Sequence, residues 1–130
     1  MAQVAHSEPN PVYHRDIRPQ NIVKKSNEDD WFLIDWTDAE TPGMRSPHNV
    51  QFDPTNHDPR VCDPGHGGEV DIWGVGYCLI RLAASRRVTC PDEVREIGRN
   101  WQGSTPTAVE ALAQIKVLNF NRLSCLILMF

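Results

Sequence analysis

The sequence of 130 residues lacks several features that would place it in a special class of protein. It has no run of about 18 apolar residues, the length needed to cross a bilayer, so no membrane-spanning helix is expected. Its four cysteines form no CxxC pair and no zinc-finger spacing. Acidic residues outnumber basic ones, 17 to 13, and the net charge of -4 argues against a nucleic-acid-binding surface.

The N-terminus also lacks the apolar segment of a secretory signal, and unpaired thiols are typical of a reducing compartment. We therefore expect a cytoplasmic or nuclear protein with no membrane partner. What the sequence does contain is an ordinary globular balance, with 40% hydrophobic and 23% charged residues. The length suits one domain with a modest core.

Two short strand patterns and three helical patterns define the expected fold. Residues 21–25 (NIVKK) and 31–34 (WFLI) favour strands, and the polar turn residues between them predict a hairpin. Residues 36–68 are rich in proline and predict a long irregular loop, which in a compact domain is usually functional. Helical periodicity then returns and predicts helices at residues 69–85, 91–101 and 106–118. The expected fold class is α+β, mainly helical, with a small β-hairpin.

The first of these helices is apolar nearly all round, so we expect it to be buried. Thr89 is the expected N-cap of the second helix. Thr105 followed by Pro106 is the expected start of the third, because proline is common at the first helical position.

Residues 14–21 read HRDIRPQN, in which a carboxylate is followed by an amide five positions later. A carboxylate beside an attacking hydroxyl group can accept its proton, and an amide oxygen is a ligand that Mg²⁺ accepts. The octapeptide resembles the catalytic loop of protein kinases, H-R-D-x-x-x-x-N. The resemblance implies that Asp16 is the catalytic base, that Arg18 contacts the transferred phosphate, and that Asn21 binds magnesium.

A second resemblance lies at the end of the expected hairpin. Asp35 follows the strand at 31–34, where protein kinases carry the aspartate that binds the magnesium bridging the ATP phosphates. The triplet here reads Asp-Trp-Thr, so Thr37 replaces the usual glycine. A β-branched residue resists positive φ, and we expect the backbone flip seen at this point in many kinases to be hindered.

Residues 71–76 read DIWGVG and resemble the segment that opens the buried central helix of the kinase C-lobe. The resemblance implies that Asp71 hydrogen-bonds the backbone of the catalytic loop, and that His14 and Arg15 are further supporting residues. It also implies that Arg15 can pair with a phosphate on the long loop. The candidate acceptors of that phosphate are Thr41, Ser46 and Thr55.

Two positions depart from the family together. Residues 57–61 read HDPRV where protein kinases have A-P-E, so Arg60 stands at the glutamate position. In residues 105–112, TPTAVEAL, Thr105 replaces the arginine that pairs with this glutamate. Losing both partners avoids a stranded buried charge, which would cost about 3–5 kcal/mol. The paired loss predicts a relaxed anchor for the substrate-binding loop.

The resemblance covers roughly residues 12–116 of a partial protein-kinase-like domain spanning 1–130, with residues 117–130 as an unassigned apolar tail. The Gly-rich loop, strand lysine and helix glutamate of a kinase N-lobe are not found in the sequence. We therefore expect the N-lobe to be absent. We also expect the chain to be a truncated fragment that is marginally stable and inactive by itself. Activity would then require the missing N-lobe or the rest of a full-length kinase.

The expected activity is protein-kinase-like transfer of a phosphoryl group from ATP to a protein hydroxyl, on Ser or Thr rather than Tyr. ATP and Mg²⁺ are the implied cofactors, and the partner is an unidentified protein substrate, not a nucleic acid. One alternative is a pseudokinase or binding module without turnover, which Thr37 and Arg60 favour. Another is a small-molecule phosphotransferase similar to aminoglycoside or choline kinases, whose patterns H-x-D-x-x-x-x-N and I-D-W also match.

Overall fold

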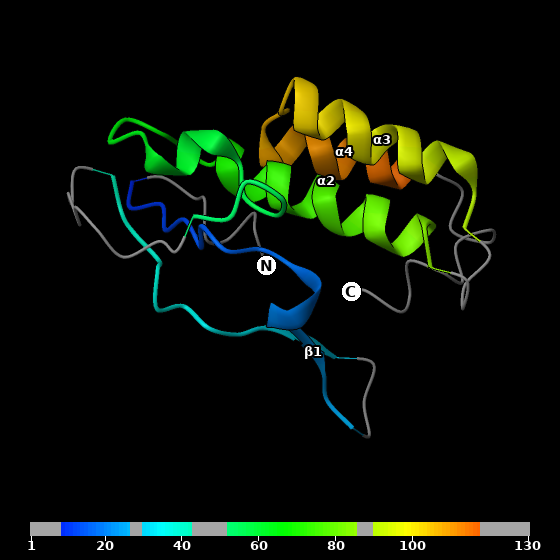
Figure 1. Cartoon of the computed structure of the whole chain (residues 1–130), viewed down its shortest axis with the longest axis horizontal. Helices are drawn as coiled ribbons and strands as arrows, with labels where there is room; N and C mark the ends of the chain where they lie inside the picture. The colour runs from blue at the N-terminus through cyan, green and yellow to red at the C-terminus, as the bar shows by residue number, and fades with distance from the viewer. Residues whose placement is uncertain (1–8, 27–29, 43–51, 86–89, 118–130) are drawn as a thin grey trace.

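The computed structural model describes residues 9–26, 30–42, 52–85 and 90–117. They form an α+β fold that is mostly helical, as the sequence predicts (Figure 1). The elements in chain order are the 3-10 helix η1 (Pro19–Asn21), strands β1 (Ile22–Lys24) and β2 (Trp31–Leu33), the 3-10 helix η2 (Pro59–Cys62), and helices α2 (Glu69–Ala83), α3 (Asp92–Gly103) and α4 (Ala108–Val117). The expected cap Thr89, the candidate phosphate acceptor Ser46 and the tail beyond residue 117 lie outside the described residues.

Strands β1 and β2 pair antiparallel, which confirms the predicted hairpin. The register sets Ile22 opposite Leu33, Val23 opposite Phe32 and Lys24 opposite Trp31. In Figure 1 the hairpin projects away from the helices. Val23 and Phe32 are both exposed, because among the described residues no other element covers that face of this two-stranded sheet.

The core lies where α2 crosses α3, with α4 beside them (Figure 1). Gly76 and Gly98 meet at the crossing: a Cβ on Gly76 would lie 2.8 Å from the Gly98 carbonyl oxygen, and the converse distance is 2.7 Å. Two glycines therefore allow the helix backbones to touch. The buried side chains around this contact are those of Ile72, Leu79, Val94, Trp101 and Ala111.

Helix α2 is buried or half-buried along most of its surface, as its apolar sequence predicts, and Arg81 is its one exposed residue. Ile72 and Leu79 are buried, while Tyr77 is half-buried and Arg81 is exposed. Tyr77 and Arg81 face a pocket that is also lined by Pro19 and Gln20 of η1. None of the described helices combines the length and the apolar character needed to cross a membrane.

Helix α4 begins at Ala108, so the prediction that Thr105 caps a helix starting at Pro106 is wrong. Thr107 and Glu110 form a reciprocal cap instead. The backbone N–H of Thr107 donates to Glu110 Oε2 over 2.8 Å, and the N–H of Glu110 donates to Thr107 Oγ1 over 3.3 Å. Such a capping box gives hydrogen-bond partners to two backbone N–H groups at the start of the helix. Thr105 followed by Pro106 makes no such pair of hydrogen bonds.

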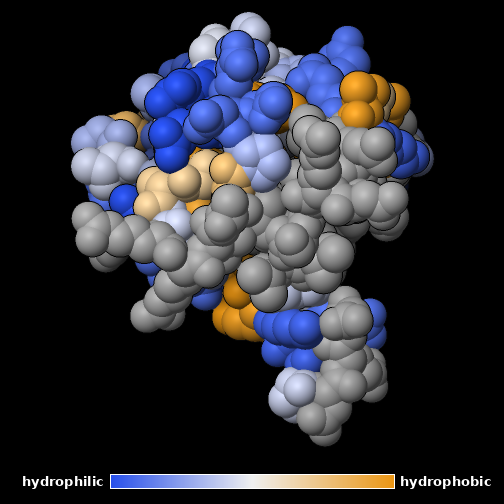
Figure 2. All heavy atoms as spheres, turned by 90° about the vertical axis from the view of Figure 1, so that its right-hand side faces the viewer, coloured by the Kyte–Doolittle hydropathy of each residue, from blue (hydrophilic) through white to orange (hydrophobic). Residues whose placement is uncertain are grey.

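Figure 2, a space-filling view, shows one face of the molecule. The described residues on that face are mostly hydrophilic, and the hydrophobic ones among them form separate small areas. Scattered apolar residues of this kind are normal for a folded chain.

Candidate active site

The loop at residues 14–18 is held by the first turn of α2. Asp71 is 2% exposed, and its carboxylate accepts the backbone N–H of His14 over 2.8 Å and that of Arg15 over 2.7 Å. These are the hydrogen bonds that the kinase resemblance implies for Asp71. A carboxylate in the first turn of a helix is also favoured by the helix dipole.

The same loop lies directly on the backbone of α2. A Cβ on Gly74 would lie 2.7 Å from the carbonyl oxygen of Ile17 and 2.9 Å from its Cβ. Glycine is therefore required at this position of the DIWGVG segment, because any side chain would push the loop away from the helix.

The carboxylate of Asp16 is the centre of the site. It is 6% exposed and accepts hydrogen bonds from three side chains. Asn21 Nδ2 lies 2.8 Å from Oδ2, a guanidinium nitrogen of Arg18 lies 3.1 Å from Oδ2, and His57 Nε2 lies 2.9 Å from Oδ1. The structure thus brings together Asp16, Arg18 and Asn21, and it adds His57.

Two hydrogen bonds join the end of β2 to this loop. The N–H of Ile34 donates to the carbonyl of Asn21 over 2.8 Å. His14 Nδ1 accepts the N–H of Asp16 over 3.3 Å, so its Nε2 carries the proton and donates to the carbonyl of Ile34 over 2.9 Å. His14, 1% exposed, therefore sets the position of the backbone just before Asp35.

The Asp35 side chain is exposed and accepts a hydrogen bond from Thr37 Oγ1 over 2.7 Å. This hydrogen bond is the main cause of a lowered pKa of Asp35, and a hydrogen bond with the Thr37 backbone and the positive charge of Arg18 lower the pKa further. Asp35 is thus a carboxylate at neutral pH, beside the loop but not in hydrogen-bond contact with Asp16.

Arg15 and Asp35 have positive φ angles, 70° and 60°, and no other non-glycine residue in the described ranges does. Such a backbone conformation costs on the order of 1–3 kcal/mol and persists only where the surroundings enforce it. The strain falls on Asp35, not on Thr37, so the β-branched residue adopts an ordinary backbone conformation. Strained residues of this kind are concentrated at functional sites.

Arg15 joins three segments. Its guanidinium lies 2.7 Å from the carboxylate of Glu40 and donates to the backbone carbonyls of Asp38 and Val61 over 3.3 and 3.1 Å. Its side chain is 10% exposed. The partner of Arg15 in this structure is a glutamate, where the resemblance implies a phosphate.

Arg60 and Thr105, which the kinase alignment pairs, do meet. Arg60 donates to Thr105 Oγ1 over 3.2 Å. Its main partner is Asp58, a buried carboxylate two residues earlier, and this hydrogen bond raises the pKa of Arg60. Arg60 thus forms an ion pair with Asp58 and a neutral hydrogen bond with Thr105. Protein kinases have a glutamate–arginine ion pair between these two segments.

Asn21 and Asp35 fit a magnesium ion by the chemistry of their donors. Asn21 uses its amide nitrogen for both contacts with Asp16, so the amide oxygen, the atom that binds cations, is not used in them. Mg²⁺ is usually held by one or two protein oxygen ligands together with water and phosphate. The described residues contain no group of three or more His, Cys, Asp or Glu placed to hold a metal.

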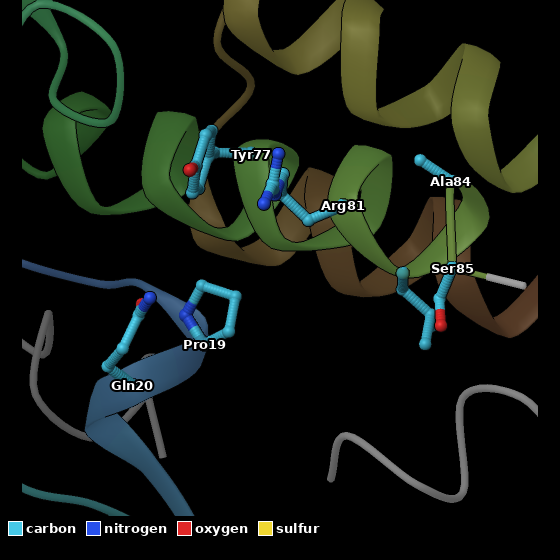
Figure 3. Close-up of a pocket in the computed structure, with 7 residues that line it drawn as sticks. Pro19, Gln20, Tyr77, Arg81, Ala84 and Ser85 are labelled. Atoms are coloured by element: carbon cyan, nitrogen blue, oxygen red, sulfur yellow. The ribbon is translucent and has the colours of Figure 1, made fainter. Parts of the chain in front are cut away.

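A pocket of about 460 Å³ lies between η1 and the partly exposed side of α2 (Figure 3). It does not include Asp16, Asn21 or Asp35, so it is separate from the carboxylate site. Its lining residues are Pro19, Gln20, Tyr77, Arg81, Leu82, Ala84 and Ser85.

Sequence reasoning did not identify Glu40 as a site residue, and it did not connect His57 with Asp16. His57 lies 41 positions from Asp16 and stands in a stretch that the alignment treats as an anchor. No local pattern marks either residue, because both contacts join segments that are distant in the sequence.

Comparison with known proteins gives two matches. The serine/threonine-protein kinase ksp1 of Schizosaccharomyces pombe is 26% identical over 135 residues, which cover 95% of this chain and 28% of that protein. The chain is similar to a serine/threonine kinase. Crinkler effector protein 8 of Phytophthora infestans is 33% identical over 108 residues, which cover 76% of this chain and 18% of that protein.

The chain thus spans less than a third of the length of either relative. No protein-family model matches it, and no solved structure matches it.

Proposed function

We propose that this chain carries the catalytic-loop region of a protein-kinase-like phosphotransferase, which moves the γ-phosphoryl group of ATP to a protein hydroxyl, on Ser or Thr in preference to Tyr. The observation that carries the proposal is the buried Asp16 carboxylate, held by Asn21 and Arg18 on a loop that Asp71 fixes. Similarity to a serine/threonine kinase over 95% of the chain supports it.

In the proposed reaction Asp16 accepts the proton of the attacking hydroxyl group. The hydroxyl oxygen bonds to the γ-phosphorus while the bond to the β-phosphate oxygen breaks, and ADP leaves. Arg18 remains 33% exposed beside Asp16, so its positive charge can stabilise the transferred group. Asn21 and Asp35 would hold Mg²⁺, which when bound neutralises charge on the phosphates.

The phosphate-covering Gly-rich loop and strand lysine that such a reaction needs are not among the motifs of this sequence. We propose that additional sequence or a partner chain supplies them. The assay therefore uses two forms of the protein, the 130-residue chain and a version extended by any in-frame coding sequence upstream of Met1.

The test measures Mg-dependent nucleotide binding and transfer from γ-labelled ATP to protein acceptors. We expect Asp16→Asn to reduce transfer about 10²- to 10⁴-fold, the usual share of a general base, while nucleotide affinity is kept. Asp35→Asn should weaken the magnesium dependence of binding. Transfer by Asp16→Asn at the wild-type rate would refute the proposal.

The same assay separates the two alternatives. Nucleotide binding by both forms without transfer would favour a non-catalytic binding module. Transfer to small alcohols but not to protein would favour the small-molecule phosphotransferase, whose I-D-W pattern is present at residues 34–36.

A further inference from the structure

A histidine from the long loop contacts the candidate catalytic base directly. His57 Nε2 lies 2.9 Å from Asp16 Oδ1, and the two side chains are 6% and 8% exposed. The contact joins segments that are 41 positions apart, so it ties this part of the long loop to the catalytic loop. Nothing in the kinase resemblance assigns a role to this residue.

The second ring nitrogen of His57 determines which atom carries the proton. The backbone N–H of Asp53 lies 3.0 Å from Nδ1, and the carbonyl oxygen of the same residue lies 3.3 Å from it. The shorter contact, with the N–H donor, makes Nδ1 the acceptor. In the neutral imidazole the other nitrogen then carries the hydrogen. His57 therefore donates its Nε2–H to the carboxylate of Asp16.

The ring is held by a tight turn of its own segment. The backbone N–H groups of Asn56 and His57 both donate to the carbonyl of Asp53, over 3.1 and 3.0 Å. The Asp53 carboxylate accepts the N–H and the hydroxyl of Thr55 over 2.9 and 2.7 Å. Because the turn fixes both the backbone and Nδ1, the imidazole reaches Asp16 in one orientation.

The carboxylate of Asp16 keeps room for a substrate. An ionised carboxylate offers about four lone-pair positions, and the three donors Asn21, Arg18 and His57 use three of them. His57 alone holds Oδ1, whereas Asn21 and Arg18 share Oδ2. Without His57, only Oδ2 would be held, and the position of Oδ1 would be less constrained.

We propose that His57 is a positioning residue for the proposed phosphoryl transfer: its Nε2–H fixes Oδ1 of Asp16 and so aims the remaining lone pair at the acceptor hydroxyl. The proposal rests on the proposed function of Asp16. It makes catalysis depend on the turn at residues 53–57 being in place.

The kinetic test compares three variants in the form of the protein that shows transfer. Removing the donor with His57→Leu should lower kcat about 10- to 100-fold, the usual effect of losing the outer partner of a functional side chain, with KM for ATP unchanged. His57→Gln supplies an amide N–H in place of Nε2–H and should recover most of kcat. His66→Leu removes another half-buried histidine, one that does not contact Asp16, and should leave kcat unchanged.

A second measurement does not depend on turnover. Ring ¹⁵N shifts in the 130-residue chain should report the Nε2–H tautomer of His57. The His57 signal should change in Asp16→Ala and stay the same in Asp35→Ala. Circular dichroism and urea denaturation would establish that each variant is folded.

An Nδ1–H tautomer, a His57 signal unaffected by Asp16→Ala, or a rise in kcat with His57→Leu would overturn the positioning role while leaving the proposed function intact. A rise in kcat would mean that His57 blocks the carboxylate. By contrast, the Nε2–H tautomer together with no transfer in any form of the protein would overturn the proposed function and the role of His57 with it.

Discussion

The buried side chain of Asp71 fixes the position of the loop at residues 14–18. Its two carboxylate oxygens each accept one backbone N–H, from His14 and Arg15, and the residue is nearly inaccessible to solvent. Hydrogen bonds to an ionised acceptor are stronger than neutral ones. The position of Asp16, one residue further on, therefore depends on the first turn of α2.

Replacing Asp71 with asparagine should destabilise the protein by about 2 kcal/mol, because one oxygen becomes an N–H₂ group facing a backbone N–H. The urea midpoint measures the change. Glu96→Gln, an exposed substitution in α3, is the control and should stay within about 0.5 kcal/mol of wild type. Equal midpoints for both variants would contradict this account of the loop.

The sequence is sufficient to identify individual site residues when they belong to one short motif. Asp16, Arg18 and Asn21 stand within one octapeptide, and the structure places them in contact. His57 and Glu40 could not be found in this way, since their partners are set by how the long loop folds back. Their contacts are visible only in three dimensions.

Helix α2 serves as the common support for the core and the site. Gly76 lies against α3, and Gly74 lies against the loop residue Ile17, so the helix backbone touches other backbone on two sides. Close contacts of this kind leave little freedom for adjustment, since protein interiors are densely packed.

Gly74→Ala should therefore be destabilising, although alanine favours helix by about 1 kcal/mol over glycine. The new methyl group would lie within 3 Å of Ile17 backbone, and overpacking costs about 1–3 kcal/mol. The matched control is Gly103→Ala, since a Cβ there meets nothing within 4 Å. Thermal denaturation of both variants tests the difference, and a more stable Gly74→Ala protein would refute the contact.

The hairpin and the helical segments could be predicted because their periodic patterns are local. The start of α4 could not, since two cap signals compete there: Thr105 with Pro106, and Thr107 with Glu110. The reciprocal hydrogen bonds of the second pair decide the outcome. The proline-rich loop was expected to be irregular, and the short η2 within it begins with Pro59, a position where proline is tolerated.

For the whole molecule, the cysteines provide a probe of folding. Cys62 is exposed, whereas Cys78 is 2% exposed in α2 and burial raises its pKa to about 12. Because the thiolate is the reactive form, we expect iodoacetamide at pH 8 to modify Cys62 quickly and Cys78 only in denaturant. Mass spectrometry of the peptides gives both rates. Comparable rates without denaturant would mean that α2 is not packed as described.

Acid should weaken the fold through three exposed carboxylates. Hydrogen bonds lower the pKa of Asp35 and Asp53 from 3.8, chiefly from the hydroxyls of Thr37 and Thr55, and that of Glu110 from 4.5, chiefly from the backbone N–H of Thr107. A lowered pKa in the folded state stabilises the protein above the ordinary pKa. That contribution is lost as the pH falls through the folded-state value.

The urea midpoint should accordingly fall between pH 6 and about pH 2, because the loss is complete only below the lowered pKa values. Thr55→Val removes the hydroxyl hydrogen bond to Asp53 and should reduce that fall. If the variant and the wild type lose stability equally over this range, the hydrogen bond to Asp53 does not contribute.

The guanidinium of Arg15 is already neutralised by Glu40. A newly added anion on Thr41 or Thr55 would have to expel that glutamate from a largely enclosed position before it could bind. In this structure Glu40 thus supplies, at Arg15, the negative charge that the kinase resemblance assigns to a phosphate. Treatment with a phosphatase should leave the melting temperature of the purified protein unchanged.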